Sequence, residues 1–203
     1  MQFYLFVLIR VGAENWIQYQ RRIRHRGQFG FSVIELLTVM AVTSISLVVV
    51  TPSLRQLSAN WQLKTAANSL YYSLLLARSE AIKRNERVVL CKSADGNTCD
   101  TSGGWQQGWI VFVDSNNNTK VDMGESIVLY QQQFQPNLRI TGNLPLSNYI
   151  SYKGSGATAQ MSGAFQAGTL TACSASKGQV DAHKIIVNSV GNARRIKETI
   201  SSC

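Results

Sequence analysis

The sequence predicts an α+β protein in which one long N-terminal helix precedes a C-terminal domain of antiparallel strands arranged in two sheets. Two patterns carry this prediction: an apolar run with helical spacing over 31–85, and short β-like runs separated by Gly, Asn and Ser over 86–203. A chain of 203 residues has room for one globular domain and an extended element. We therefore expect a leader (1–30), a membrane segment (31–50), an amphipathic helix (51–85) and a β-rich domain (86–203).

The membrane segment is predicted from the run Phe31–Val50, which is apolar except for Ser, Thr and one acid. Twenty helical residues span a hydrocarbon core of ~30 Å. Arginines crowd its N-terminal side, at positions 21, 22, 24 and 26, so the positive-inside rule places that end in the cytoplasm. The sequence thus predicts a single-pass inner-membrane protein whose C-terminal domain lies on the far side, in the periplasm.

Beyond Pro52 the apolar residues recur at steps of three and four, which is typical of an amphipathic helix. We expect one apolar stripe, facing the β-rich domain and ending near Arg84. Its members are Leu54, Leu57, Trp61, Leu63, Ala66, Ala67, Leu70, Leu74, Ala77 and Ala81. Together with the membrane half, the helix would be ~80 Å long, a length that suits a filament core better than a compact soluble domain.

The β-rich domain is expected to form two antiparallel sheets with one face packed on the helix. The last two predicted strands are joined by a turn at Gly191-Asn192. The predicted strands are Arg87–Lys92, Trp109–Asp114, Ser126–Gln131, Leu138–Thr141, Tyr149–Lys153, Ala164–Cys173, Lys184–Val190 and Ala193–Lys197.

The four cysteines, Cys91, Cys99, Cys173 and Cys203, favour two disulfides in an oxidising compartment. No CxxC pair is present, and His25 and His183 are the only histidines, so the spacing argues against zinc, and no cofactor is expected. Of the three connectivities, we favour Cys91–Cys99, which brackets a short polar loop, and Cys173–Cys203, which ties the C-terminus to a strand.

Glu35 is unusual because an acid inside a membrane helix costs roughly 2.5–3.5 kcal/mol on insertion scales. One interpretation is that its carboxylate reaches the interface; the other is that it pairs with an amine of a neighbouring subunit. The run Gly30-Phe31-Ser32-Val33-Ile34-Glu35-Leu36-Leu37 resembles the processing motif of type IV prepilins. The resemblance implies cleavage by a prepilin peptidase between Gly30 and Phe31, N-methylation of Phe31, and a role for Glu35 in assembly with other pilins. The apolar start of the leader departs from the family, which suggests either a long leader or a start codon assigned too far upstream.

The segment around Trp105 and Trp109, with its Asn-rich turn and acidic second strand, narrows the resemblance to a branch of minor subunits. That branch includes the H pseudopilin of type II secretion and the fimbrial T and U minor pilins. The resemblance implies a non-enzymatic subunit that helps initiate a type IV pilus. The alternatives are an H-type pseudopilin and a DNA-binding minor pilin for DNA uptake.

Two further patterns suggest binding sites. The first pattern matches positions one, three, five and twelve of a calcium loop, at Asp114, Asn116, Asn118 and Glu125. Thr119 stands where such a loop has glycine. The alternative is a plain hairpin tip, since Asn-rich turns have the same composition.

Gly191 and Arg194 match part of a Gly-Arg-x-Arg hairpin that binds DNA in some fimbrial T proteins, with Arg195 as a second candidate contact. Asn192 replaces the first arginine of that motif, which favours the alternative of charged residues on a solvated edge strand. The net charge of +9 is weak support for DNA, because residues 1–30 hold five of the 20 Lys and Arg and one of the 11 Asp and Glu. Nothing marks a nucleophile beside His183, and no paired catalytic carboxylates appear.

Overall fold

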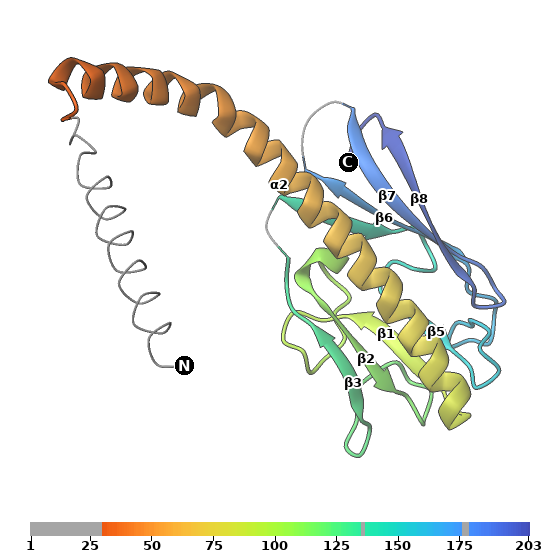
Figure 1. The fold of residues 1–203 in the computed structure, drawn as a ribbon. Helices are drawn as coiled ribbons and strands as arrows, with labels where there is room; N and C mark the ends of the chain where they lie inside the picture. Colours follow the sequence, from red (N-terminus) through yellow and green to blue (C-terminus); the bar gives the residue numbers. More distant parts are fainter. Residues whose placement is uncertain (1–29, 135–136, 176–178) are drawn as a thin grey trace, which may run out of the picture. The chain divides into compact units, whose positions relative to one another are not determined.

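The computed structural model describes residues 30–134, 137–175 and 179–203, so the predicted leader and its arginines lie almost entirely outside the described residues. Helix α2 (Val33–Arg84) precedes the strands, which lie beside its C-terminal half in Figure 1. The chain divides into two compact units, Met1–Pro52 and Ser53–Cys203, and each is treated by itself below.

Helix α2 runs without interruption to Arg84, as the spacing of apolar residues predicts. It begins one turn after the predicted cleavage site, and Ser32 O accepts the N–H groups of Glu35 and Leu36 at its first turn. Within the described part of the chain, no helix combines the length and apolar character needed to cross a membrane. The membrane role of Phe31–Val50 stays a prediction.

One face of α2 packs against both sheets. Its contact residues are small or aliphatic, and alanine brings the helix axis close to the strands because it carries only a methyl group. They are Leu63, Ala66, Ala67, Leu70, Leu74, Ala77 and Ala81. The single stripe predicted from sequence is wrong in its first three members, since Leu54, Leu57 and Trp61 are exposed. The apolar residues of α2 belong to two faces. Steps of three and four residues occur on both faces, so the steps by themselves did not separate the two sets.

The β-rich domain holds two four-stranded antiparallel sheets, as predicted. The first has the order β3-β2-β1-β5, built from β1 (Val88–Lys92), β2 (Trp109–Val113), β3 (Ile127–Gln131) and β5 (Tyr149–Tyr152). The second has the order β4-β6-β7-β8, built from β4 (Leu138–Gly142), β6 (Gly168–Ser174), β7 (Val180–Val187) and β8 (Ala193–Ile200).

Three strands differ from the prediction by three residues or more at an end. Strand β7 begins at Val180 instead of Lys184 and β8 ends at Ile200 instead of Lys197, because the two strands pair as far as Val180 and Ile200. Strand β6 begins at Gly168 instead of Ala164, because residues 160–164 form a turn in which Gln160 N–H bonds to Ala164 O. Strand β7 ends at Val187 instead of Val190, because Asn188 N–H bonds to Asn192 O and closes the β7–β8 turn early.

The main core lies where α2 meets the two sheets, and its two buried tryptophans have their indole N–H groups satisfied. Trp109 donates to Ser73 Oγ on α2 at 2.9 Å, and Trp105, in a short 3-10 helix (Trp105–Gln107), donates to Leu146 O at 3.1 Å. A buried donor without a partner would cost about 1–3 kcal/mol. The Trp109 bond therefore helps to fix how α2 registers on β2, and the Trp105 bond holds the 3-10 helix to the loop between β4 and β5.

The structure joins Cys91 to Cys99 and Cys173 to Cys203, the two pairs favoured from sequence. The first bond closes the loop that covers the outer face of the β3-β2-β1-β5 sheet, where Cys91 packs with Ile110 and Phe112. The second holds the C-terminal residue against β6, beside Ala182 of β7.

Candidate functional surfaces

The residues of the predicted processing site are accessible. Gly30 and Phe31 precede the helix and are exposed, and Phe31 is 82% exposed. Glu35 lies in the first turn of α2 and is exposed within the described unit. An exposed, non-helical peptide bond is a suitable substrate for a peptidase, and the geometry leaves the roles of Gly30, Phe31 and Glu35 as predictions.

A second apolar stripe on α2 is exposed in the 53–203 unit, and it is formed by Leu54, Leu57, Trp61, Tyr72, Leu75 and Ile82. At about 100° per residue these positions fall within roughly 80° of one another, on the side of the helix opposite Leu70. Trp61 and Tyr72 are 61% and 63% exposed. A helix that is apolar on both faces is expected to be covered on both, and the domain covers only one.

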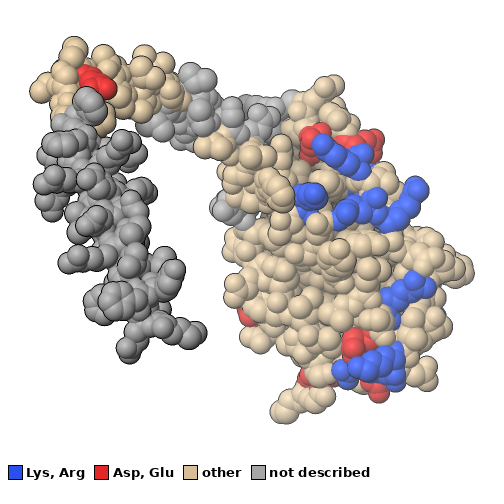
Figure 2. All heavy atoms as spheres, viewed as in Figure 1, with Lys and Arg blue, Asp and Glu red and all other residues tan. Residues whose placement is uncertain are grey.

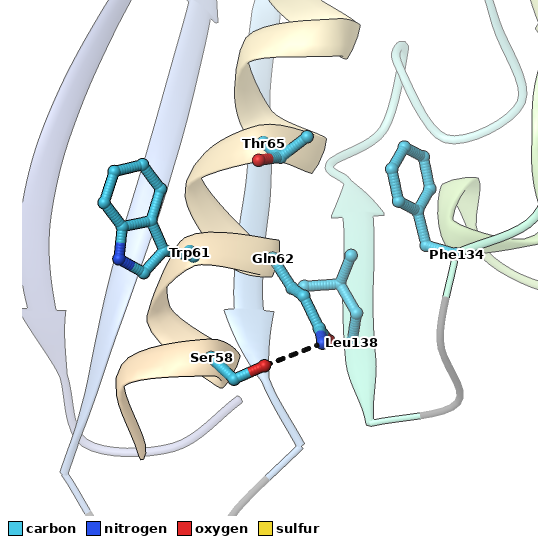
Figure 3. Close-up of a pocket in the computed structure, with 6 residues that line it drawn as sticks. All are labelled: Ser58, Trp61, Gln62, Thr65, Phe134 and Leu138. Carbon is cyan, nitrogen blue, oxygen red and sulfur yellow. Dashed lines mark hydrogen bonds between the residues drawn. The ribbon is translucent and has the colours of Figure 1, made fainter. Parts of the chain in front are cut away.

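A groove of about 230 Å³ adjoins this stripe at the start of the 53–203 unit. Figure 3 shows its lining: Ser58, Trp61, Gln62 and Thr65 come from α2, Leu138 comes from β4, and Phe134 from the segment before β4. Gln62 Nε2 donates to Ser58 Oγ at 3.3 Å. The groove therefore extends the exposed apolar surface of α2 onto the edge of the β domain.

The predicted DNA hairpin is held to the helix by Arg78, although the side chains of Asn192, Arg194 and Arg195 are exposed. Arg78 on α2 donates from Nε to Gly156 O at 3.1 Å, from Nη2 to Val190 O at 3.2 Å, and from Nη1 to Asn192 Oδ1. Asn192, at the position of the missing arginine, thus accepts a hydrogen bond from the helix.

The two candidate DNA contacts do not converge. Arg195 pairs with Ile185, whose side chain is in the core, and its guanidinium lies 5.7 Å from the centre of the Tyr71 ring. Arg194 is the next residue of the strand, so it projects from the opposite face of the sheet. The structure brings no paired arginines to the hairpin, and the DNA-binding alternative is not supported.

The predicted calcium residues gather at the turn between β2 and β3, but their oxygens accept N–H groups of the same loop. Asp114 accepts from the backbone of Asn118 and Thr119 at 2.9 and 3.1 Å. Glu125 accepts from the backbone of Ser115 and Asp122 at 3.0 and 3.1 Å.

Asn116 and Asn118 use their amide groups to donate to the Asp122 carboxylate, and Thr119 adopts a positive φ of 58° where a calcium loop has glycine. Among the described residues, no group of three or more His, Cys, Asp or Glu could hold a metal ion. The hairpin-tip alternative describes this loop, and the calcium hypothesis has no support from the structure.

The sequence interpretation missed both the exposed stripe and the Arg78 contacts. The stripe had a signal, since Tyr72, Leu75 and Ile82 continue the spacing of Leu54, Leu57 and Trp61. The Arg78 contacts had none, because its partners lie 78–114 residues away in the chain.

The long helix packed on two antiparallel sheets is a pilin-like fold. The family model for the type II transport protein GspH matches residues 66–191, and the chain belongs to this family of minor pilins and pseudopilins. The type IV minor pilin FimU of Pseudomonas aeruginosa has a similar fold, with a TM-score of 0.53 and 16% sequence identity over 72% of this chain and 98% of FimU. The minor pseudopilin EpsH of the Vibrio cholerae Type 2 Secretion System aligns with a TM-score of 0.44 and 15% identity over 66% of this chain and 96% of EpsH. No curated protein matches the sequence.

Proposed function

We propose that the chain is a minor pilin, made as a precursor, cut between Gly30 and Phe31 and N-methylated at Phe31. In this proposal Phe31–Val50 anchors it in the bacterial inner membrane, the β domain lies in the periplasm, and the mature chain joins a type IV pilus as a structural, non-enzymatic subunit. Membership of the minor pilin and pseudopilin family supports a filament role.

The observation that carries the proposal is the second apolar stripe of α2. The face around Leu70 is covered by the chain's own sheets, whereas Trp61, Tyr72 and Leu75 are exposed on the other side. Six exposed large apolar residues along one helix face favour burial against another protein surface. Helices of neighbouring subunits are the partners that a helix-packed filament provides, and an acid at Glu35 would pair there with a neighbour's N-terminal amine.

A second candidate is an H-type pseudopilin of a type II secretion system. The matching family model, which carries the description of a type II transport protein, favours it. Both candidates need the same processing and the same helix packing. They differ in the filament that contains the chain, so loss of the gene should impair pili in one case and protein secretion in the other.

The stripe is tested by Trp61→Ser and Tyr72→Ser, made separately in the natural host. Both side chains are exposed, so the free energy of unfolding should change by less than about 0.5 kcal/mol. The fraction of the protein recovered in sheared filaments should fall several-fold, because the apolar contact with a neighbour is lost. Phe165→Ser is the matched control, since Phe165 is an exposed aromatic residue away from the helix.

Wild-type incorporation of both stripe variants would show that this face does not mediate assembly. Mass spectrometry of the recovered subunits tests the processing step in the same samples, with N-methylated Phe31 expected as the first residue. An N-terminus at any other position contradicts the proposed cleavage site.

A further inference from the structure

The charges of the 53–203 unit are segregated along the chain. Residues 93–126 contain five Asp and Glu and one Lys, a net charge of −4. Residues 53–92 and 127–203 together contain 14 Lys and Arg against four Asp and Glu, a net charge of +10. The segment 93–126 supplies the loops around β2 in one sheet, whereas many of the bases lie on α2, β7 and β8. Figure 2 shows Lys and Arg gathered over the side that carries β7 and β8.

The segment 93–126 is here called the acidic loops, and hydrogen bonds favour the charged form of two of its carboxylates, Asp95 and Asp122. Hydrogen bonds from the backbone of Asn97 and Thr98 hold the pKa of Asp95 far below its ordinary value. The side-chain amides of Asn116 and Asn118 lower the pKa of Asp122. Both Asp95 and Asp122 are exposed. None of the four ion pairs in the described residues involves the acidic loops.

Two of the bases, Lys64 and Lys197, line a pocket of about 290 Å³ between α2 and the strands β7 and β8. This basic pocket is lined by Asn60, Leu63, Lys64, Asp181, His183 and Lys197. Asp181 is paired with Lys197 at 2.7 Å and therefore cancels one charge. Burial lowers the pKa of His183, and the nearby cations Arg195 and Lys197 lower it further, which indicates a positive potential inside the pocket.

Two cations beside the pocket contact aromatic rings and have no carboxylate partner among the described residues. Lys64 Nζ lies 5.6 Å from the centre of the Trp61 ring, and the Arg195 guanidinium lies 5.7 Å from the centre of the Tyr71 ring. An aromatic face restricts a cation without neutralising its charge. The cations therefore remain free to pair with an anion that approaches from outside.

We propose that the acidic loops of a second copy of this chain dock on the basic pocket, with Asp122 of one copy directed toward Lys64 of the other. The acidic loops are the charge-complementary surface that the chain itself provides. The contact joins two different patches, so it is heterologous and leaves one acidic and one basic surface unused for further copies. In the proposed filament, this electrostatic contact between β domains acts together with the packing of the helices. The biological setting of the contact therefore rests on the proposed function.

Exposed ion pairs contribute little individually, so the association is weak and decreases as salt rises. The full mature chain in detergent micelles is the material for the test, and sedimentation velocity measures its mass at rising protein concentration. We expect dimers and larger species at about 20 mM salt, and monomers above about 0.3 M, where the Debye length falls to roughly 5 Å. A carbodiimide that joins carboxylates to lysine amines should link the acidic loops to Lys64 between ¹⁵N-labelled and unlabelled copies.

Charge reversal makes the test specific. Lys64→Glu and Asp122→Lys should each abolish self-association, but a mixture of the two should associate, because one variant keeps intact acidic loops and the other an intact pocket. Lys153→Glu is the control, since it makes the same charge change at an exposed site outside the pocket. The proposal is overturned if the wild-type chain stays monomeric at low salt, if Lys153→Glu is as damaging as Lys64→Glu, or if the mixture does not associate. These outcomes concern the purified chain, so they are distinguishable from a failure of the stripe variants to enter filaments.

Discussion

Arg78 offers the sharpest test of how the helix positions the β domain. Its guanidinium binds two separate turns, one at Gly156 and one at Val190–Asn192. These turns touch each other so closely that a Cβ added at Gly191 would lie 1.9 Å from Gly156 O. Because Gly191 also has a positive φ of 83°, only glycine fits there without strain.

The cost of Arg78→Ala follows from the three contacts that it removes. A hydrogen bond from a charged donor contributes about 1.5–3 kcal/mol when buried. Two of the three contacts are exposed, and water can replace them in part, so we expect a loss of about 2–3 kcal/mol in the free energy of unfolding. Lys83→Ala is the control, because Lys83 is exposed and the loss of its surface ion pair with Glu80 should leave the free energy of unfolding nearly unchanged.

Asn192→Arg extends the same reasoning. It removes the acceptor for Arg78 Nη1 and places a second guanidinium beside the first, so it should destabilise the domain by about 1–2 kcal/mol. Urea titration followed by tryptophan fluorescence measures all three variants. A cost below about 0.5 kcal/mol for Arg78→Ala, or an unchanged stability for Asn192→Arg, would refute the assignment of Arg78 as the residue that holds the two turns.

Two other predictions concern the cysteines and the histidine of the basic pocket. Replacing both cysteines of Cys173–Cys203 by Ser should lower the free energy of unfolding by about 3.6 kcal/mol, and the same change at Cys91–Cys99 by about 2.5 kcal/mol. The difference arises because the first disulfide closes a loop with a sequence separation of 30 and the second a loop with a separation of 8. Equal losses in urea titrations, or peptide mapping that finds other pairs, would contradict this. The pKa of His183 is lowered by burial and by Arg195 and Lys197, so the unfolded state binds its proton more readily and stability should fall as pH drops below about 6.5. His183→Gln should flatten that decline relative to wild type, and an unchanged pH profile would show that His183 does not cause it.

The sequence by itself determined the extent of the long helix and the order of the elements. The absence of Gly and Pro between Ser53 and Arg84 leaves nothing to interrupt the helix, and the Gly and Asn residues beyond Asn85 mark the turns. The favoured disulfide pairs also followed from chain position, since a sequence separation of 8 between Cys91 and Cys99 makes a short closed loop. These features depend on neighbours in the chain, which a pattern records directly.

Which face of α2 forms the core depends on tertiary contacts. Leu57 and Leu70 have the same polarity and both belong to apolar stripes with helical spacing, yet Leu70 is buried and Leu57 exposed. The choice depends on the alanines at 66, 67, 77 and 81, which let the sheets approach one side of the helix and leave the bulkier Trp61 and Tyr72 on the other. The same is true of Asn192, whose side chain meets Arg78 across 114 residues of chain. Spacing along a sequence records which residues share a face, but the shape of the opposing surface determines which face is covered.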